Sequence, residues 1–141
     1  MKYLILLMVP LFALGRGYTK DGFVPVDNME QTKCSAQSTS STYVDCFVVT
    51  LPTNSGYKLS ADCTGIRSDN AEFGSVLKEA LFRRATGVAI LEGSVVVQFD
   101  QTGGAGWTMT LDVDSNDARV RVKSPVETVN WTCSIKLVKK L

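Results

Sequence analysis

The chain has 141 residues and a formal net charge of +1, with 45% hydrophobic and 21% charged residues. Such a composition is typical of one globular domain with its own core. Proteins that bind nucleic acid through phosphates carry a clear basic excess, so no nucleic-acid partner is expected. The chain has no histidine, which excludes Ser-His-Asp hydrolysis, Cys-His proteolysis and HExxH metal sites. Because its acidic residues are also scattered, we expect a binding protein without enzymatic activity, cofactor or metal.

The N-terminal segment has the pattern of a signal peptide. Lys2 precedes an apolar run from Tyr3 to Leu14, and Ala13 and Gly15 place small residues where a signal peptidase would cut. The run is too short for a transmembrane helix, which needs roughly 20 residues. An uncleaved anchor and a buried strand are the alternatives. We expect a signal peptide over 1–15, a single disulfide-bonded β-rich domain over 16–141, secretion or periplasmic location, and no stable membrane insertion.

Export gives the four cysteines a structural role. An even number of cysteines in an oxidising compartment indicates two disulfides, with three possible pairings. The sequence YVDCFVVTL-PTNSG-YKLSADC is typical of a hairpin whose turn lies midway between Cys46 and Cys63. A hairpin folded there would place these two cysteines opposite one another. The expected pairs are therefore Cys46–Cys63 and Cys34–Cys133, and zinc binding is the alternative.

Residues 73–87 read as one amphipathic helix in the middle of the chain. Asp69 and Glu72 have the spacing of a capping box, and apolar residues then recur at helical intervals. Arg83 and Arg84 would lie in the last turn, where the helix dipole favours cations, and Gly87 would end the helix. The expected role of this helix is to cover one side or one end of a sheet.

The second half of the chain has β-strand patterns. WTMTLDV, ARVRV and VNWTCSIKL alternate apolar and polar residues, which predicts three half-buried strands. VAILEGSVVVQF is nearly continuously apolar and predicts a central strand buried on both faces, bent or bulged at Gly93. The expected fold is mainly β with one central α-helix. Trp107 and Trp131 could stack on a ligand ring, although their places on apolar strand faces favour core packing.

Several short motifs resemble the OB-fold B subunits of bacterial AB-type toxins, in the branch of subtilase-cytotoxin and pertussis-like subunits. A cystine between Cys46 and Cys63 would precede the helix, as it does in that branch, and a Trp107-Thr108 pair follows the next strand. Five residues in and directly after the predicted helix match the family's sequence pattern: Phe73, Ala80, Leu81, Thr86 and Gly87. The resemblance spans residues 43 to about 108.

The resemblance implies an OB-like antiparallel barrel, with a β-sandwich carrying an inserted helix as the alternative. It implies a homopentamer that recognises host cell-surface glycans or glycoproteins and can carry a catalytic A subunit. Asp21 and Trp107 would contact the glycan, although Pro25 and Val26 stand where the family has a serine. The polar helix face would line a central pore through Lys78, Glu79, Arg83 and Arg84.

Two other classes fit the same pattern. One is a periplasmic or extracellular protein-binding module, such as an inhibitor or immunity protein, which would use exposed strand edges for partner contact. The other is a structural subunit of a virion or appendage, built as a β-sandwich. Oligomeric state and glycan binding distinguish these classes from a toxin-type B subunit.

Overall fold

The computed structural model describes residues 29–101, 103–104 and 106–141, which form eight β-strands without a helix. The predicted signal peptide over 1–15 lies outside the described residues. Within them, no helix is long and apolar enough to cross a membrane. The strands are β1 Met29–Ser38, β2 Val44–Thr50, β3 Ser55–Arg67, β4 Phe73–Arg84, β5 Ile90–Gln101, β6 Thr108–Asp114, β7 Asp117–Lys123 and β8 Val129–Lys139.

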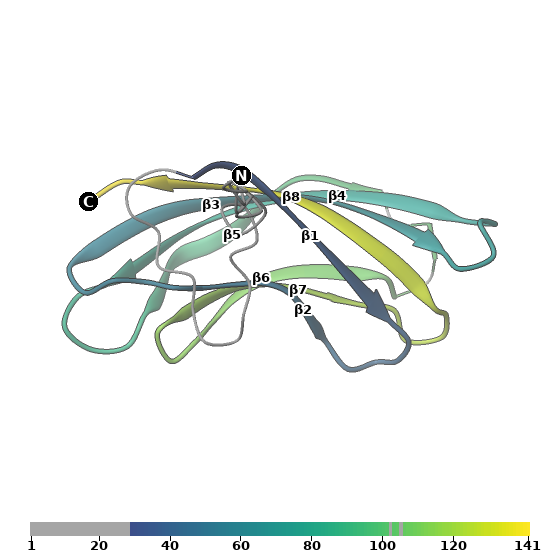
Figure 1. Cartoon of the computed structure of the whole chain (residues 1–141), viewed down its shortest axis with the longest axis horizontal. Helices are drawn as coiled ribbons and strands as arrows, with labels where there is room; N and C mark the ends of the chain where they lie inside the picture. Colours follow the sequence, from purple (N-terminus) through teal and green to yellow (C-terminus); the bar gives the residue numbers. More distant parts are fainter. Residues whose placement is uncertain (1–28, 102, 105) are drawn as a thin grey trace, which may run out of the picture.

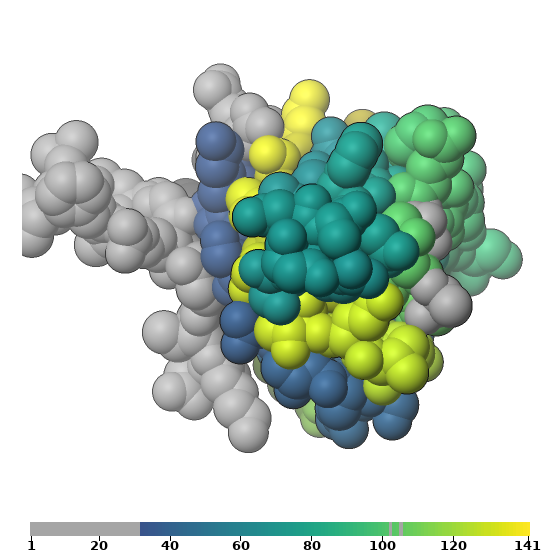
Figure 2. Space-filling model, turned by 90° about the vertical axis from the view of Figure 1, so that its right-hand side faces the viewer, coloured from purple at the N-terminus to yellow at the C-terminus, as the bar shows by residue number. Residues whose placement is uncertain are grey.

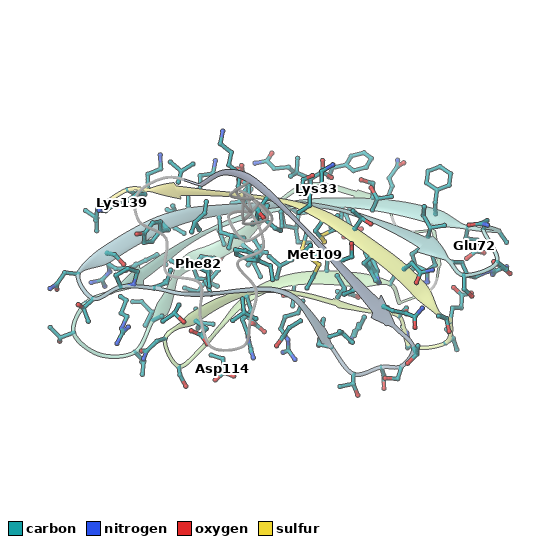
Figure 3. The ribbon with its side chains drawn as sticks, viewed as in Figure 1. Lys33, Glu72, Phe82, Met109, Asp114 and Lys139 are labelled. Atoms are coloured by element: carbon teal, nitrogen blue, oxygen red, sulfur yellow. A yellow bond between two sulfur atoms is a disulfide. The ribbon has the colours of Figure 1, made fainter. Side chains whose placement is uncertain are left out.

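The strands build two antiparallel sheets that face one another (Figure 1). The larger sheet has the order β1-β8-β3-β4-β5, and the smaller sheet has the order β2-β7-β6. Alternate side chains of each strand point between the sheets, so both layers contribute to one core. Figure 3 labels two such residues, Phe82 from the larger sheet and Met109 from the smaller, and both lie between the layers.

The predicted OB barrel is wrong, because the described strands form two open sheets. The predicted alternative of a β-sandwich is the right architecture, except for its inserted helix. Three of the strand predictions are confirmed: the three alternating segments are β6, β7 and β8. In β8 the whole apolar set faces the core at no more than 1% exposure: Val129, Trp131, Cys133, Ile135 and Leu137.

The predicted helix over 73–87 is also wrong, since residues 73–84 form β4 between β3 and β5. Even-numbered residues of β4 such as Val76 and Phe82 are buried in the core, and odd-numbered Phe73 and Leu81 are exposed on the outer face. Both faces of this strand are thus partly apolar, and two interleaved period-2 sets reproduce the three- and four-residue spacing of a helix. Ladders on both sides fix the extended form.

The predicted N-cap, Asp69, has a different local role. It lies in the turn between β3 and β4, where its carboxylate accepts hydrogen bonds from Ala71 N at 3.0 Å and from Arg67 Nε at 2.7 Å. Hydrogen bonding to the Arg67 side chain lowers the pKa of Asp69 to about 2. The same short polar side chain that caps helices also stabilises turns, so the capping signal was ambiguous.

All four cysteines form disulfides, but the predicted pairing is wrong. The bonds are Cys34–Cys46 and Cys63–Cys133. The predicted hairpin does not form, because β2 pairs with β7 in the smaller sheet while β3 pairs with β4 and β8 in the larger one. Two disulfides buried in the core fit a protein that resides in an oxidising, extracellular environment.

Candidate interaction surface

Strand β5 is the edge of the larger sheet and pairs with β4 alone among the described strands. The prediction of a central strand buried on both faces is therefore wrong for this segment. The predicted irregularity at Gly93 is confirmed: Gly93 has a φ of 75°, and the β4–β5 register shifts between Glu79 and Leu81. An end view places the green atoms of β5 on the opposite side of the molecule from the blue atoms of β1 (Figure 2).

The unequal size of the two sheets explains why β5 is exposed. The three strands of the smaller sheet cannot cover all five strands of the larger sheet. The edge strand of the smaller sheet, β6, contacts β4 and β5. On the inner side of β5, Leu91 and Val95 pack against the core, whereas Val97 is 53% exposed. The inner face of the strand is thus covered along part of its length.

The outer face of β4 and β5, which points away from the smaller sheet, carries most of the exposed apolar side chains of the larger sheet. Cross-strand pairs place Val96 opposite Glu79 and Phe99 opposite Leu77. Together with Val97 at the same edge, these residues make a surface that we call the β4–β5 patch. Its members are more than one-third exposed: Phe73, Leu81, Ile90, Val96, Val97 and Phe99.

Two shallow hollows lie within this region. The first, of about 290 Å³, is lined by Lys58, Glu79 and Val96, among others, and the second, of about 530 Å³, is lined by Phe73, Phe99 and neighbouring polar residues. The second hollow lies where β4 begins and β5 ends, and the first lies further along the two strands, beside Glu79 and Val96. The patch therefore has relief into which side chains of a partner can fit.

A polar network centred on Glu79 crosses the patch. Its carboxylate accepts a hydrogen bond from Ser60 Oγ at 2.7 Å and forms an ion pair with Lys58 Nζ at 2.9 Å. Gln98 Nε2 donates to the same carboxylate at 3.3 Å, so Glu79 connects β3, β4 and β5. These contacts, the one with Lys58 first, lower the pKa of Glu79 from its ordinary value. The network thus links polar side chains of three neighbouring strands on the outer face.

The remaining charges of β5 lie at its two ends. Glu92 forms an ion pair with Arg83 across the β4–β5 ladder. Asp100 is exposed near the other end. Between them, residues 94–99 read SVVVQF and contain no charged side chain. The centre of this edge strand therefore presents an uncharged, largely apolar surface without the lysines or prolines that commonly protect sheet edges.

The four residues predicted to line a pore are divided between two faces of β4. Glu79 and Arg83 lie on the outer face, as described above. Lys78 instead donates to the carbonyl of Met109 in the smaller sheet at 2.6 Å, and Arg84 donates to the carbonyl of Leu51 at 2.7 Å. A common polar face would require a helix, whereas a strand sends successive side chains to opposite sides.

The two predicted glycan contacts have different outcomes. Asp21 lies outside the described residues, so its role stays a prediction. Trp107 is 4% exposed, its Nε1 donates to Glu127 at 2.9 Å, and its ring makes an edge contact with Trp131 at a centroid distance of 5.9 Å. This is the core packing that the alternation of its segment favoured, and the ring is not open for stacking on a sugar.

The patch was missed in the sequence because one pattern has two explanations. A continuous apolar run is expected both in a strand buried on two faces and in an edge strand that associates with a partner. The signal that favoured the edge was the polar residues at its C-terminal end, Gln98, Asp100 and Gln101. Residues in the middle of a parallel or sandwich core are seldom so polar.

No family model and no curated protein sequence matches this chain. Among solved structures, it is similar to the tailspike protein gp49 of the Acinetobacter baumannii bacteriophage Fri1, a capsular polysaccharide depolymerase, with a TM-score of 0.45 and 9% identity over 81% of this chain and 21% of that chain. It is also similar to the tailspike protein of A. baumannii phage AM24, with a TM-score of 0.43 and 8% identity over 76% of this chain and 25% of that chain. The chain thus spans about a quarter or less of the length of these proteins.

Proposed function

We propose that the chain is a secreted, non-enzymatic subunit that associates with a second copy of itself through the β4–β5 patch. The observation that carries the proposal is the exposure of Val96, Val97 and Phe99, at 51%, 53% and 44%, on an edge strand of 12 residues. Large apolar side chains gathered at an open edge mark an association site or an aggregation hazard. An extracellular assembly subunit uses such an edge.

A second copy fits this edge in apolarity and in charge. With a two-fold axis near Val97, the uncharged stretch of one β5 meets the same stretch of the other, and Asp100 lies near Ser94 of the partner. Glu92 keeps its own counterion, Arg83. Closed two-fold dimers are the commonest assemblies of soluble proteins.

The other edge of the sheet fits less well. From residue 32 onward, where the side chains of β1 are described, the exposed ones are polar, namely Lys33, Ser35 and Gln37. Pairing β1 of one copy with β5 of the next would leave the apolar side chains of β5 against this polar surface. The composition of the two edges thus favours β5 with β5. Glycan recognition, a pentamer and a catalytic A subunit stay predictions.

The test is the mass of the purified chain in solution as a function of concentration. We expect light scattering after size exclusion to give twice the monomer mass for the wild type and the monomer mass for Val97→Lys, because two lysines would face each other near the axis. Ser35→Lys makes the same charge change on the opposite edge and should leave the dimer intact. A wild type that stays monomeric up to high concentration, or a dimer that Val97→Lys does not weaken, would overturn the proposal in favour of a different occupant.

A further inference from the structure

Three of the four cysteines form a row across the middle of the larger sheet. Cys133 on β8 is directly opposite Cys34 on β1 and directly opposite Cys63 on β3. All three point into the core and are at most 2% exposed. Cys133 therefore has a cysteine neighbour on each side, of which it is bonded to Cys63.

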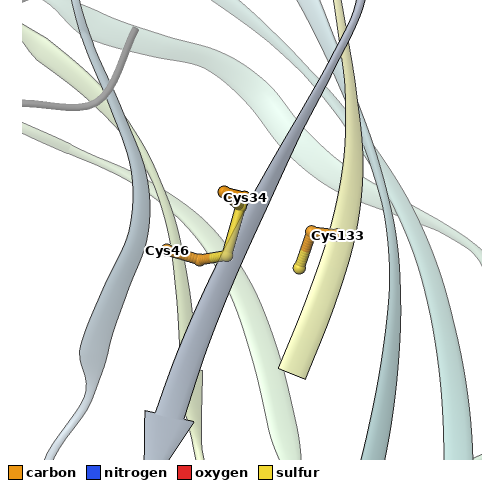
Figure 4. Close-up of side chains that lie close together, drawn as sticks. All are labelled: Cys34, Cys46 and Cys133. Carbon is orange, nitrogen blue, oxygen red and sulfur yellow. A yellow bond between two sulfur atoms is a disulfide. The ribbon is translucent and has the colours of Figure 1, made fainter. Parts of the chain in front are cut away.

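The fourth cysteine reaches this row from the smaller sheet. Cys46 on β2 is bonded to Cys34, and the Sγ atoms of Cys34, Cys46 and Cys133 all lie within 4.8 Å of one another (Figure 4). The two disulfides are thus neighbours in the core. A thiolate released at Cys34 or Cys46 therefore has the Sγ atom of Cys133, in the other disulfide, within 4.8 Å.

We propose that Cys133 is a disulfide-exchange centre, through which Cys34 and Cys63 can trade places as its partner inside the folded domain. In a chain with a free Cys34, the Cys34 thiolate attacks Cys133 Sγ. The Cys34–Cys133 bond forms as the Cys63–Cys133 bond breaks, and Cys63 leaves as a thiolate and takes up a proton. One disulfide and one thiol are present before and after, so no oxidant or reductant is consumed.

The sheet geometry supports both bonds. Cys63 and Cys133 are joined across neighbouring strands with a Cα separation of 4.0 Å. Cys34 has the equivalent register position on the other side of β8. Directly opposed residues of antiparallel strands lie roughly 4.5–5.5 Å apart, within the span that a disulfide bridges. Changing partners therefore requires rotation of side chains while both ladders stay intact.

Exchange of this kind would let the protein correct its disulfides after the sandwich has formed. A β1–β8 bond, Cys34–Cys133, can form early because its strands are neighbours. The Cys46 thiolate can then attack Cys34, which restores Cys34–Cys46 and frees Cys133 to pair with Cys63 when a small-molecule disulfide oxidises them. The last oxidation thus needs an external disulfide, whereas the step before it is an exchange between neighbouring cysteines of the core.

The test uses Cys46→Ala in the full-length secreted chain, which leaves three cysteines without placing a polar group in the core. After incubation in native buffer, acid quench, alkylation and peptide mapping, we expect the free thiol on Cys63 as well as on Cys34. The approach to this mixture should be about tenfold faster at pH 7.5 than at pH 6.5, because the thiolate is the attacking species. Its rate should not depend on protein concentration, since the exchange is intramolecular.

The matched control is Cys133→Ala, which removes the centre of the row. Cys63 is then two strand spacings from Cys34, roughly 10 Å, and the label should stay on Cys63 alone. A free thiol that stays on Cys34 alone in Cys46→Ala overturns the proposal. If that variant does not fold, the reduced wild type is reoxidised with oxidised glutathione and acid-trapped. Conversion of a Cys34–Cys133 species with a free Cys63 to a Cys63–Cys133 species after removal of glutathione supports the proposal, and its persistence overturns it.

Discussion

Strands β8 and β5 belong to the same sheet and have similar lengths, 11 and 12 residues, but they differ in burial. β8 lies between β1 and β3, and its alternate residues from Val129 to Leu137 are at most 1% exposed. β5 has β4 as its one described neighbour, and Val96, Val97 and Phe99 are 44–53% exposed. β8, in which apolar and polar residues alternate, is thus the strand that packs into the core, whereas β5, in which apolar residues are consecutive, is exposed.

The alternating pattern of β8 and the continuous apolar pattern of β5 differ in what they indicate about burial. Strict alternation in β8 indicates that one face of the strand is apolar and the other polar. The apolar face alone can then pack into the core. The continuous run of apolar residues in β5 indicates that both faces of the strand are apolar. This pattern does not determine whether the second face packs against another layer of the same chain or against another molecule. In this sandwich the smaller sheet covers the inner face of β5 along part of its length, and no described strand covers its outer face or its free edge.

The sharpest test of the comparison removes one aromatic ring from each strand. Trp131→Ala in β8 should lower the free energy of unfolding by about 4 kcal/mol, because its buried ring packs on Trp107 and its Nε1 donates to Ser38 Oγ. Phe99→Ala in β5 should cost less than about 1 kcal/mol, as expected for a half-exposed side chain. Urea unfolding of both variants at a concentration where the chain is monomeric gives the two values. Equal losses would contradict the distinction between the strands.

A second test concerns the tie between the sheets. Cys34–Cys46 fastens the smaller sheet to the β1–β8 half of the larger sheet, over a sequence separation of 12 residues. Cys34→Ala/Cys46→Ala should therefore cost about 3 kcal/mol through the greater freedom of the unfolded chain. Ser35→Ala, next to Cys34 on the exposed face of β1, should stay within about 0.5 kcal/mol. A loss for the double variant no larger than that of Ser35→Ala would show that the bond contributes little.

Three of the eight described strands could be predicted from the sequence, because each of them has a locally unambiguous pattern. Residues 108–114, 117–123 and 129–139 alternate, and the structure pairs them as expected for half-buried strands. Ser115, which has a φ of 55°, lies in the tight turn between β6 and β7. In these segments the local pattern favours the same half-buried strand that the tertiary structure requires, so the pattern is enough to predict the strand.

The candidate site could not be predicted in the same way, because its properties depend on neighbours in space. Residues 73–84 have helix-like spacing, and only the ladders with β3 and β5 make them a strand. Cys46 and Cys63 flank a sequence that looks like a hairpin turn, but the strands on either side join different sheets. Exposure of Val97 follows from how many strands the opposite sheet has, a quantity that no local pattern contains.

A smaller effect is expected at the bend in β5. Gly93 has a φ of 75° and no atom near the place of a Cβ, so Gly93→Ala tests backbone strain without steric overlap. Left-handed backbone should make this variant about 1 kcal/mol less stable. Gly87→Ala is the matched control, because Gly87 also has open space but no positive φ, and it should be neutral or slightly stabilising. Thermal unfolding measures both, and a neutral Gly93→Ala would show that β5 relaxes at no cost, as a loosely held edge strand could.

The smallest effect concerns how Glu79 holds β5 to the rest of the sheet in acid. Its pKa is lowered in the folded chain, so the stabilisation it gives is complete above its unfolded pKa of about 4.3 and is lost as the pH falls through the lower folded value. Glu79→Gln should cost about 0.5 kcal/mol at pH 7, since the Lys58 pair is partly exposed, and should flatten the fall in stability below pH 4. Asp62→Asn serves as the control, because it removes an exposed charge from the outer face of the neighbouring strand β3. An unfolding free energy whose pH dependence is the same in Glu79→Gln as in the wild type would mean that this carboxylate gains nothing from its contacts with β3 and β5. The edge strand would then be held by its ladder with β4 and by the packing of Leu91 and Val95 on the core.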